Sequence, residues 1–397
     1  MLYLDYAAST PLHPEVLEKM MPYLTENYGN PSGVHAQSRF AKNAIESARE
    51  GIANFLGASP DEIFFTSGGT EAANWAVFGI ADATPREDSH FVTSKIEHHG
   101  VLNAFAKLDK EGFDVSFLSP CKEGYINASD LQKAIKPNTR LVSIMLANNE
   151  VGTIQPIKEL TRTAAKHNTC FHTDAVQAIG HIPVDVNELG VDLLSFSAHK
   201  FYGPKGIGGL YIKKGTKIHS QLYGGSQERN RRAGTENVAG IVGMHEALKI
   251  CASNMEIEKT KLENLRDKLI HEILTNIPHS RLNGTIGHKR LPGNVHISFD
   301  FIEGESLLMH LDLQGICAST GSACSSGSLE PSHMLMAMGL THEEANGAIR
   351  FSLGMFSTED DIKQLMPVLI TSVERLRNLS PLYDDYIIRR KGEQNGL

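Results

Sequence analysis

The chain has 397 residues, a formal net charge of -8 and a sequence pI near 6.1. Hydrophobic residues make up 41% of it and charged residues 21%, which is typical of a soluble globular protein long enough for two domains. This acidic balance argues against general nucleic-acid binding, because nucleic-acid-binding proteins usually present a basic domain or stripe.

Targeting and redox patterns indicate the cytoplasm and no membrane attachment. The segment MLYLDYAAST has no cationic start and carries Asp5, so a secretory signal is not expected, and no apolar run approaches the roughly 20 residues that cross a bilayer. The cysteines are odd in number and widely spaced, without a CxxC pair, which indicates a reducing compartment without disulfides. They are Cys121, Cys170, Cys251, Cys317 and Cys324.

The first part of the chain alternates short apolar runs with helix-like stretches. Each run is bounded by Gly, Pro, Asn or Asp, as buried strands are. Strands that alternate with helices predict a mostly parallel sheet covered on both faces. The expected strands are 63–66, 90–94, 115–118, 141–146, 170–173, 192–197 and 208–212, and the expected helices are 35–57, 70–81, 99–111, 129–135 and 156–167.

The pattern changes after about residue 250. A long charged helix is expected over 254–274, followed by strands at 294–299, 316–320 and 348–354. We expect the polar tail after Pro381 to fray at its end. The predicted organisation is a large domain over 14–254 and a smaller α/β domain made of 1–13 and 255–397.

Polar motifs follow five of the expected strands. Because ligands gather at the carboxyl ends of strands in open parallel sheets, these motifs are expected to form one site. In chain order they are TSGGTE, IEHHG, NNE, TDAVQ and SAHK.

Three of these motifs suggest cofactor chemistry. SGGTE is a glycine-rich turn before a helix, which suits a phosphate group or an ordinary helix cap. In SAHK, Lys200 follows a buried strand, and such a lysine is solvated, paired with an acid, or bound to a carbonyl. Asp174, after another strand, could hold a buried cation. A Schiff-base lysine with an aspartate at a pyridinium nitrogen is the recurring protein contribution to pyridoxal phosphate chemistry.

Two other site classes are less favoured. His98 with His99, and His172 with Asp174, lack a third ligand at close spacing, so no metal site is predicted. Stacking of one histidine on a cofactor ring is the favoured use, with a helix cap as the alternative. The segment GPKGIGG lacks the spacing of a nucleotide-binding P-loop.

Ordered motifs along nearly the whole chain resemble the cysteine desulfurases of the NifS and IscS group. These are pyridoxal-phosphate-dependent enzymes of the class V aminotransferase family, so the resemblance implies an α/β fold like that of aspartate aminotransferase (PLP fold type I). A large domain with a mostly parallel sheet would carry a smaller C-terminal α/β domain. The motifs are LDYAAST (4–10), YGNPS (28–32), FTSGGTEAAN (65–74), SKIEHHGV (94–101), NNEVGTIQPI (148–157), HTDAVQAIG (172–180), SFSAHKFYGPKGIGGLY (195–211), GGSQERNRRAGTENV (224–238), STGSACSSGSLEPS (319–332) and IRFSLG (349–354).

The resemblance implies roles residue by residue. Lys200 would bind the cofactor covalently, Asp174 would pair with the pyridine nitrogen, and His98 would stack on the ring and help to move protons. Arg350 would hold the substrate carboxylate in a bidentate pair, with Asn149 nearby. Thr235 would reach the phosphate from a second subunit, which implies a homodimer. The cofactor-binding set is Gly69, Thr70, His98, Asn149, Asp174, Gln177, Ser197, His199, Lys200 and Thr235.

Cys324 lies among small and hydroxylated residues in STGSACSSGSLEP. The resemblance implies that its thiolate attacks the sulfur of L-cysteine, leaves L-alanine, and carries the sulfur as a persulfide. The implied acceptor is an iron–sulfur scaffold or tRNA-thiolation protein, and Cys324 can also ligate an iron–sulfur cluster during transfer. The ending YDDYIIRRKGEQNGL lacks the SIEWAHH-like sequence linked to scaffold docking in the IscS branch, so the pathway stays open.

Three alternatives remain from the sequence. Selenocysteine lyase and cysteine sulfinate lyase use the same cofactor and do not need a loop cysteine. From another class, the chain could be a catalytically silent partner or scaffold in sulfur transfer.

Overall fold

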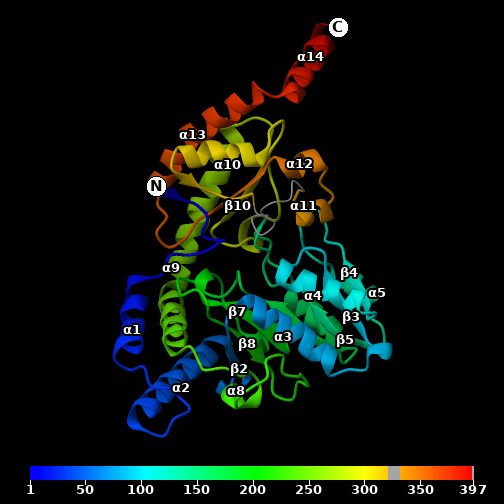
Figure 1. The fold of residues 1–397 in the computed structure, drawn as a ribbon. Coiled ribbons are helices and arrows are strands. Elements are labelled where there is room, and N and C mark those ends of the chain that lie inside the picture. Colours follow the sequence, from blue (N-terminus) through cyan, green and yellow to red (C-terminus); the bar gives the residue numbers. More distant parts are fainter. Residues whose placement is uncertain (321–330, 396–397) are drawn as a thin grey trace.

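The protein is described by a computed structural model that covers residues 1–320 and 331–395. Figure 1 shows two bodies that share the long helix α9 (Val238–Asn276). We call the seven-stranded sheet with its helices the large body, and the three-stranded sheet with its helices the small body. The N-terminus lies against the small body, and α14 (Pro381–Asn395) extends away from it.

The sheet of the large body has the strand order β2-β8-β7-β6-β5-β3-β4. Strands β3 to β7 run parallel to one another, whereas β8 is antiparallel to both of its neighbours, β2 and β7. The predicted mostly parallel sheet and the α/β fold class are therefore confirmed. The strands are β2 (Ile63–Thr66), β3 (His90–Ser94), β4 (Asp114–Leu118), β5 (Thr139–Ser143), β6 (Cys170–Asp174), β7 (Leu193–Ser197) and β8 (Gly208–Ile212).

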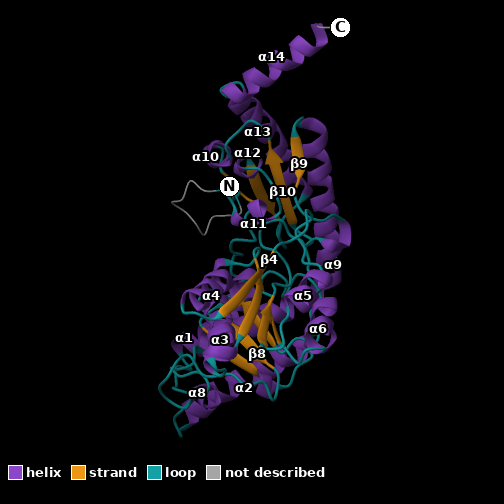
Figure 2. Ribbon diagram, turned by 90° about the vertical axis from the view of Figure 1, so that its right-hand side faces the viewer, coloured by secondary structure: helices purple, strands orange, loops and turns teal. Residues whose placement is uncertain are grey.

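Helices cover both faces of this sheet (Figure 2). On one face, α3 and α4 bury apolar side chains such as Trp75 and Phe105. On the other face, α2, α5, α6 and the first half of α9 form the larger core around Ile52, Leu160 and Met244. Apart from the edge strand β4, most residues of the sheet are buried, so its strands are rich in apolar residues. The helices are α1 (Pro14–Thr25), α2 (Ala36–Leu56), α3 (Gly69–Asp82), α4 (His99–Lys110), α5 (Ala128–Ala134), α6 (Ile157–Ala165), α7 (Val186–Leu189) and α8 (Gln227–Asn230).

The small body has its own core. Its antiparallel sheet has the order β12-β10-β9, and a parallel pair joins β1 to β11. Apolar side chains of α10, α13 and the second half of α9 pack on these strands. Its elements are β1 (Leu2–Tyr3), β9 (Ser280–Leu282), β10 (Asn294–Phe299), α10 (Gly304–Leu313), β11 (Ile316–Cys317), α11 (His333–Ala337), α12 (His342–Asn346), β12 (Ala348–Ser352) and α13 (Glu359–Arg377).

Several elements differ from the sequence predictions; β5, for example, spans Thr139–Ser143 rather than 141–146. Helix α9 begins at Val238 rather than at 254, because Asn237 caps it and Ile241 and Met244 are buried in the large body. The expected strand 316–320 forms a strand only over Ile316–Cys317, and Ser319 adds an isolated antiparallel bridge to Arg350. The tail after Pro381 is helical through Asn395, and its end at 396–397 lies outside the described residues, so the expected fraying there stays a prediction.

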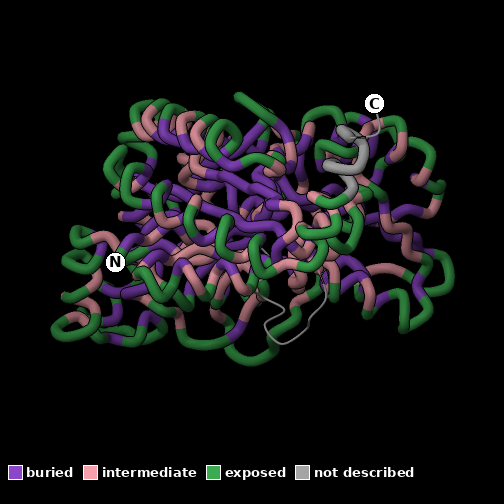
Figure 3. The backbone as a smooth tube through the Cα atoms, turned by 90° about the horizontal axis from the view of Figure 1, so that it is seen from above, coloured by how far each residue is buried: buried purple, intermediate pink, exposed green. Residues whose placement is uncertain are grey.

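The predicted domain boundary between residues 254 and 255 falls inside α9. We keep the division into 14–254 and 1–13 with 255–397 as a proposal, with α9 as the helix common to both parts. Figure 3 shows buried backbone concentrated along the centre of the molecule. Within the described residues, no helix combines the length and the apolar character needed to cross a bilayer.

Candidate active site

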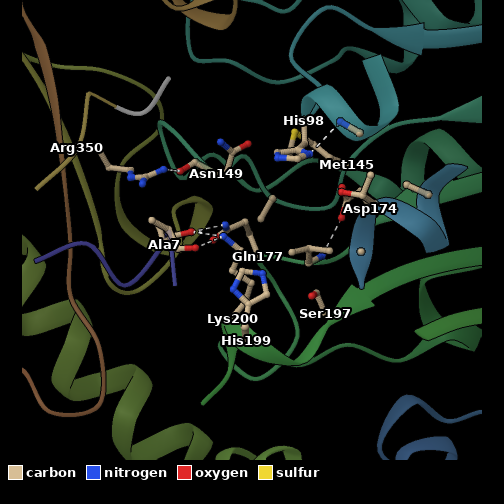
Figure 4. Close-up of a pocket in the computed structure, with 17 residues that line it drawn as sticks. Ala7, His98, Met145, Asn149, Asp174, Gln177, Ser197, His199, Lys200 and Arg350 are labelled. Carbon is tan, nitrogen blue, oxygen red and sulfur yellow. Dashed lines mark hydrogen bonds between the residues drawn. The ribbon is translucent and has the colours of Figure 1, made fainter. Parts of the chain in front are cut away.

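A cavity of about 310 Å³ opens at the carboxyl ends of the parallel strands, where the small body meets the large sheet (Figure 4). Three of its lining residues come from the small body or the N-terminal segment: Ala7, Ala8 and Arg350. The sequence-predicted residues that line it are Gly69, Thr70, His98, Asn149, Asp174, Gln177, Ser197, His199, Lys200 and Arg350.

Two predicted residues are not in this group. Thr235 is exposed, in the segment between α8 and α9, and does not line the cavity. Cys324 lies outside the described residues. Among the described residues, no group of three or more His, Cys, Asp or Glu side chains could hold a metal ion.

The N-terminus of α3 forms one end of the cavity. Strand β2 ends at Thr66, whose hydroxyl donates to the carbonyl of Gly68 at 3.0 Å and closes the turn into the helix. A Cβ at Gly69 would lie 2.7 Å from Cγ2 of Val176, so only glycine fits without a shift of that side chain. The exposed N–H groups of this end suit an anion, and Ser197 and His199 line the same cavity.

Asp174 ends β6 and is buried, with 7% of its surface exposed. Its Oδ1 accepts the N–H of Val176 at 2.9 Å. Burial raises the pKa of this carboxyl from 3.8 to about 6, although that hydrogen bond and the charge of Lys200 oppose the shift. An ionised carboxylate is therefore costly here unless a cationic ligand group lies beside it.

His98 is the N-cap of α4, and its Nδ1 accepts the N–H of Gly100 at 3.1 Å. Burial, together with the charge of Lys200, lowers the pKa of His98 to about 4, so the ring is neutral at physiological pH. The preceding residue, the buried Glu97, accepts hydrogen bonds from Ser94 Oγ at 2.5 Å and from the N–H of Met145 at 3.1 Å. These bonds fix Met145 in the cavity wall.

Lys200 ends a short turn that follows β7. Its Nζ donates to the carbonyl oxygens of Ala7 and Ala8 at 2.6 and 2.8 Å. Gln177 Nε2 donates to the same Ala7 oxygen at 2.9 Å. The backbone of the turn is held as well, because His181 Nε2 lies 2.8 Å from the carbonyl oxygen of Lys200.

Thr10 attaches the N-terminal segment to the same turn. Its hydroxyl donates to the His199 carbonyl at 2.9 Å and accepts the N–H of Tyr202 at 2.7 Å. Tyr202 has a positive φ of 66°, a conformation that costs energy for a non-glycine residue. These bonds help to hold it, so the lysine is presented from a rigid turn.

Asn149 and Arg350 face the cavity from the two bodies. Asn148 Oδ1 accepts the N–H groups of Glu150 and Val151 at 2.8 and 3.0 Å, which closes the turn that presents Asn149. Arg350, on β12, donates from Nη1 to the Asn149 carbonyl at 2.8 Å. Its Nη2 donates to Asp5 Oδ1 at 2.8 Å.

Sequence reasoning missed the carbonyls of Ala7 and Ala8, the thioether of Met145 and the carboxylate of Asp5. A backbone carbonyl has no side-chain signature, so only the fold could identify the first two. Asp5 was visible in LDYAAST, but nothing local connects it with Arg350.

The comparisons with known proteins agree with this geometry. The family described as "Aminotransferase class-V" matches residues 2–365. A curated relative from Dictyoglomus turgidum, "Cysteine desulfurase IscS", is 53% identical over 98% of this chain and 99% of its own. Another of that name, from Methanosarcina thermophila, is 51% identical over 96% of this chain and 94% of its own. The chain belongs to the cysteine desulfurases of the class V aminotransferase family.

Solved structures of this family have the same architecture. A "NIFS-LIKE PROTEIN" superposes with a TM-score of 0.87 and is 39% identical, over 94% of this chain and 99% of its own. "SspA in complex with cysteine" superposes with a TM-score of 0.80 and is 38% identical, over 90% of this chain and 100% of its own. The predicted family and its fold are thereby confirmed, and with them the enzyme class and the cofactor, pyridoxal 5'-phosphate.

The cavity fits this cofactor on three observations. The helix end at Gly69 and Thr70, with Ser197 and His199, could hold its phosphate. The buried carboxyl of Asp174 could pair with a protonated ring nitrogen, which would stabilise its ionised form. The Nζ of Lys200 lies in the same cavity, where it could attach the carbonyl carbon of the cofactor.

Proposed function

We propose that this protein is a cysteine desulfurase that converts L-cysteine to L-alanine and passes the sulfur through Cys324 to an acceptor protein. The observation that carries the proposal is the convergence of Lys200, Asp174, His98 and Arg350 on one cavity. Their chemistry covers the needs of the reaction: a covalent attachment point, an acid for the ring nitrogen, a neutral imidazole and a carboxylate anchor.

Each residue of the cavity has a role in the reaction that follows from its position. Bound pyridoxal phosphate supplies an electron-withdrawing ring that stabilises negative charge at the Cα of the substrate. Arg350 binds the α-carboxylate and thereby aligns the substrate for proton removal. Lys200, which lines the same cavity, would act as the base that takes the Cα proton of the substrate at Nζ. Asp174 would hold the ring nitrogen in its protonated form, and the neutral His98 would pack against the ring and exchange protons with the substrate.

Cys324 takes the sulfur. Its thiolate attacks the substrate sulfur, so that an S–S bond forms while the Cβ–S bond breaks and its electron pair stays with the carbon fragment. That fragment is protonated and leaves as L-alanine. The enzyme thiol is oxidised to a persulfide and the carbon fragment is reduced, so the thiol and L-cysteine give the persulfide and L-alanine without an external oxidant.

We also propose a cytoplasmic homodimer. Exposed apolar side chains near the N-terminal helices, such as Tyr28 and Val34, and Tyr223 in the segment between β8 and α8 support a second copy as their partner. Thr235 is exposed and absent from the cavity of its own chain, as expected if it serves the phosphate of the other subunit. The acceptor is proposed to be an iron–sulfur scaffold or a thiolation protein.

The test is turnover of L-cysteine by the loaded enzyme, that is, the enzyme with bound pyridoxal phosphate. L-Alanine is measured as the product. Mass spectrometry after a single turnover without reductant is expected to find one added sulfur atom on Cys324. Cys324→Ala is expected to lose both the persulfide and turnover. Cys121→Ala, at a half-buried cysteine elsewhere, is the matched control and keeps both.

Two outcomes would contradict the proposal. Full turnover by Cys324→Ala would favour a lyase that needs no loop cysteine, such as one acting on selenocysteine or cysteine sulfinate. A wild-type protein that binds pyridoxal phosphate but releases no L-alanine from L-cysteine would favour a silent partner in sulfur transfer.

A further inference from the structure

We propose that Asp5 is a positioning residue that orients Arg350 and thereby sets the affinity of the site for the α-carboxylate. The inference rests on the proposed function, in which Arg350 binds that carboxylate. Asp5 does not line the cavity, so it acts through the arginine rather than on the substrate.

The guanidinium of Arg350 is held from two sides. Its side chain is 3% exposed, and its Nη1 and Nη2 donate to Asn149 O and Asp5 Oδ1, each at 2.8 Å. Asn149 belongs to the large body, whereas Asp5 belongs to the N-terminal segment that packs on the small body. Two fixed acceptors leave the planar group little freedom to rotate.

The third nitrogen of Arg350, Nε, differs from Nη1 and Nη2 in its hydrogen bonding. Within the described residues, Nε is buried and has no hydrogen-bond partner. A buried donor without an acceptor is costly, and Arg350 lines the cavity, so an oxygen of a bound ligand is the natural partner. Guanidinium has five N–H donors, so three remain after the bonds to Asn149 and Asp5, and a carboxylate can accept two of them.

Asp5 is itself held firmly. Its carbonyl accepts from Tyr3 Oη at 3.1 Å and from the N–H of Ala8 at 3.0 Å. It also forms a parallel bridge with Ser352, which is two residues after Arg350 on β12. The same short segment provides the carbonyls that accept from Lys200 Nζ, so one stretch of chain orients both the arginine and the lysine.

Net charge alone predicts that removal of Asp5 would tighten, rather than weaken, binding of the carboxylate. Its carboxylate offsets part of the positive charge of Arg350, so its loss would tighten carboxylate binding if net charge decided the affinity. If the orientation of Arg350 decides the affinity, loss of the Asp5 acceptor allows Nη2 to bond to another group. The N–H donors that bind the carboxylate are then no longer held in the right direction. The two effects therefore differ in sign.

The test compares D5A and D5N with wild type as loaded enzymes. D5A removes the acceptor and the charge, whereas D5N removes only the charge. We expect D5A to raise KM for L-cysteine about tenfold or more, with kcat lowered by no more than about threefold, and D5N to recover most of the lost affinity. Asp267→Ala is the matched control, because Asp267 pairs with the buried Arg266 at the same 2.8 Å.

Binding provides a readout that is independent of turnover. The affinity for L-alanine, measured by calorimetry, is expected to fall in D5A by the same factor as the rise in KM. The affinity for cysteamine, which has the amine and the thiol without the carboxylate, is expected to stay unchanged.

Three results would overturn the inference: an unchanged or lower KM in D5A, an equal loss of cysteamine affinity, or no recovery in D5N. Absence of wild-type turnover on L-cysteine would instead refute the proposed function.

Discussion

The substitution Asp174→Asn tests whether the ionised carboxylate of Asp174 destabilises the protein unless a cationic group of a ligand lies beside it. Asn keeps the size of the side chain and the Oδ1 that accepts the N–H of Val176 at 2.9 Å. It removes only the negative charge. In the cofactor-free protein we expect the variant to be more stable than wild type at neutral pH, and in the loaded protein we expect the order to reverse.

The magnitude follows from the pKa of Asp174. Burial raises it from 3.8 to about 6, a difference of roughly 2 units and therefore about 3 kcal/mol. Because the folded pKa lies above the unfolded value, the carboxyl keeps its full contribution to stability below about pH 4. That contribution is lost as the pH rises through about 6. The advantage of the variant is thus about 3 kcal/mol at pH 7.5 and roughly half of that at pH 5.

The assay is urea unfolding of wild type and variant, with and without cofactor, at both pH values. Only the difference between the two proteins is used, because buried histidines add their own pH dependence to each. Asp192→Asn is the control, since Asp192 also accepts a strand N–H, that of Phe171 at 3.0 Å, but is 27% exposed and pairs with Lys213. The reasoning is refuted if the cofactor-free variant is no more stable than wild type at pH 7.5.

Two further predictions concern arginines. Arg350→Lys replaces the planar fork with a point charge, so KM for L-cysteine is expected to rise about a hundredfold, with a smaller change in kcat; an unchanged KM would place the carboxylate elsewhere. Glu228→Ala leaves Arg49 buried without its bidentate partner at 2.7 and 2.8 Å, and is expected to lower the free energy of unfolding by about 3–5 kcal/mol. Glu46→Ala removes the exposed partner of the same arginine and is expected to cost about 0.5 kcal/mol in the same urea assay; equal effects would contradict this ranking.

Much of the fold was readable because the sheet is buried on both faces. The bounds of β2, β3, β8 and β10 coincide with the predicted runs, since these strands are rich in apolar and β-branched residues and end where the chain turns. The start of α9 was not readable. Its first turns contain two glycines and no charged face, and they are helical because they pack against α1 and α2.

The sequence by itself determined that one site would form at the strand ends. Lys200, Asp174 and His98 each follow a strand of the same parallel sheet, so strand order alone brings them together. The tertiary structure decided which distant groups surround them. Asp5 and Arg350 are 345 residues apart, and the carbonyls at Lys200 Nζ belong to alanines. Long-range ion pairs and backbone acceptors depend on how the large and small bodies pack together. No local pattern of residues in the sequence predicts that packing.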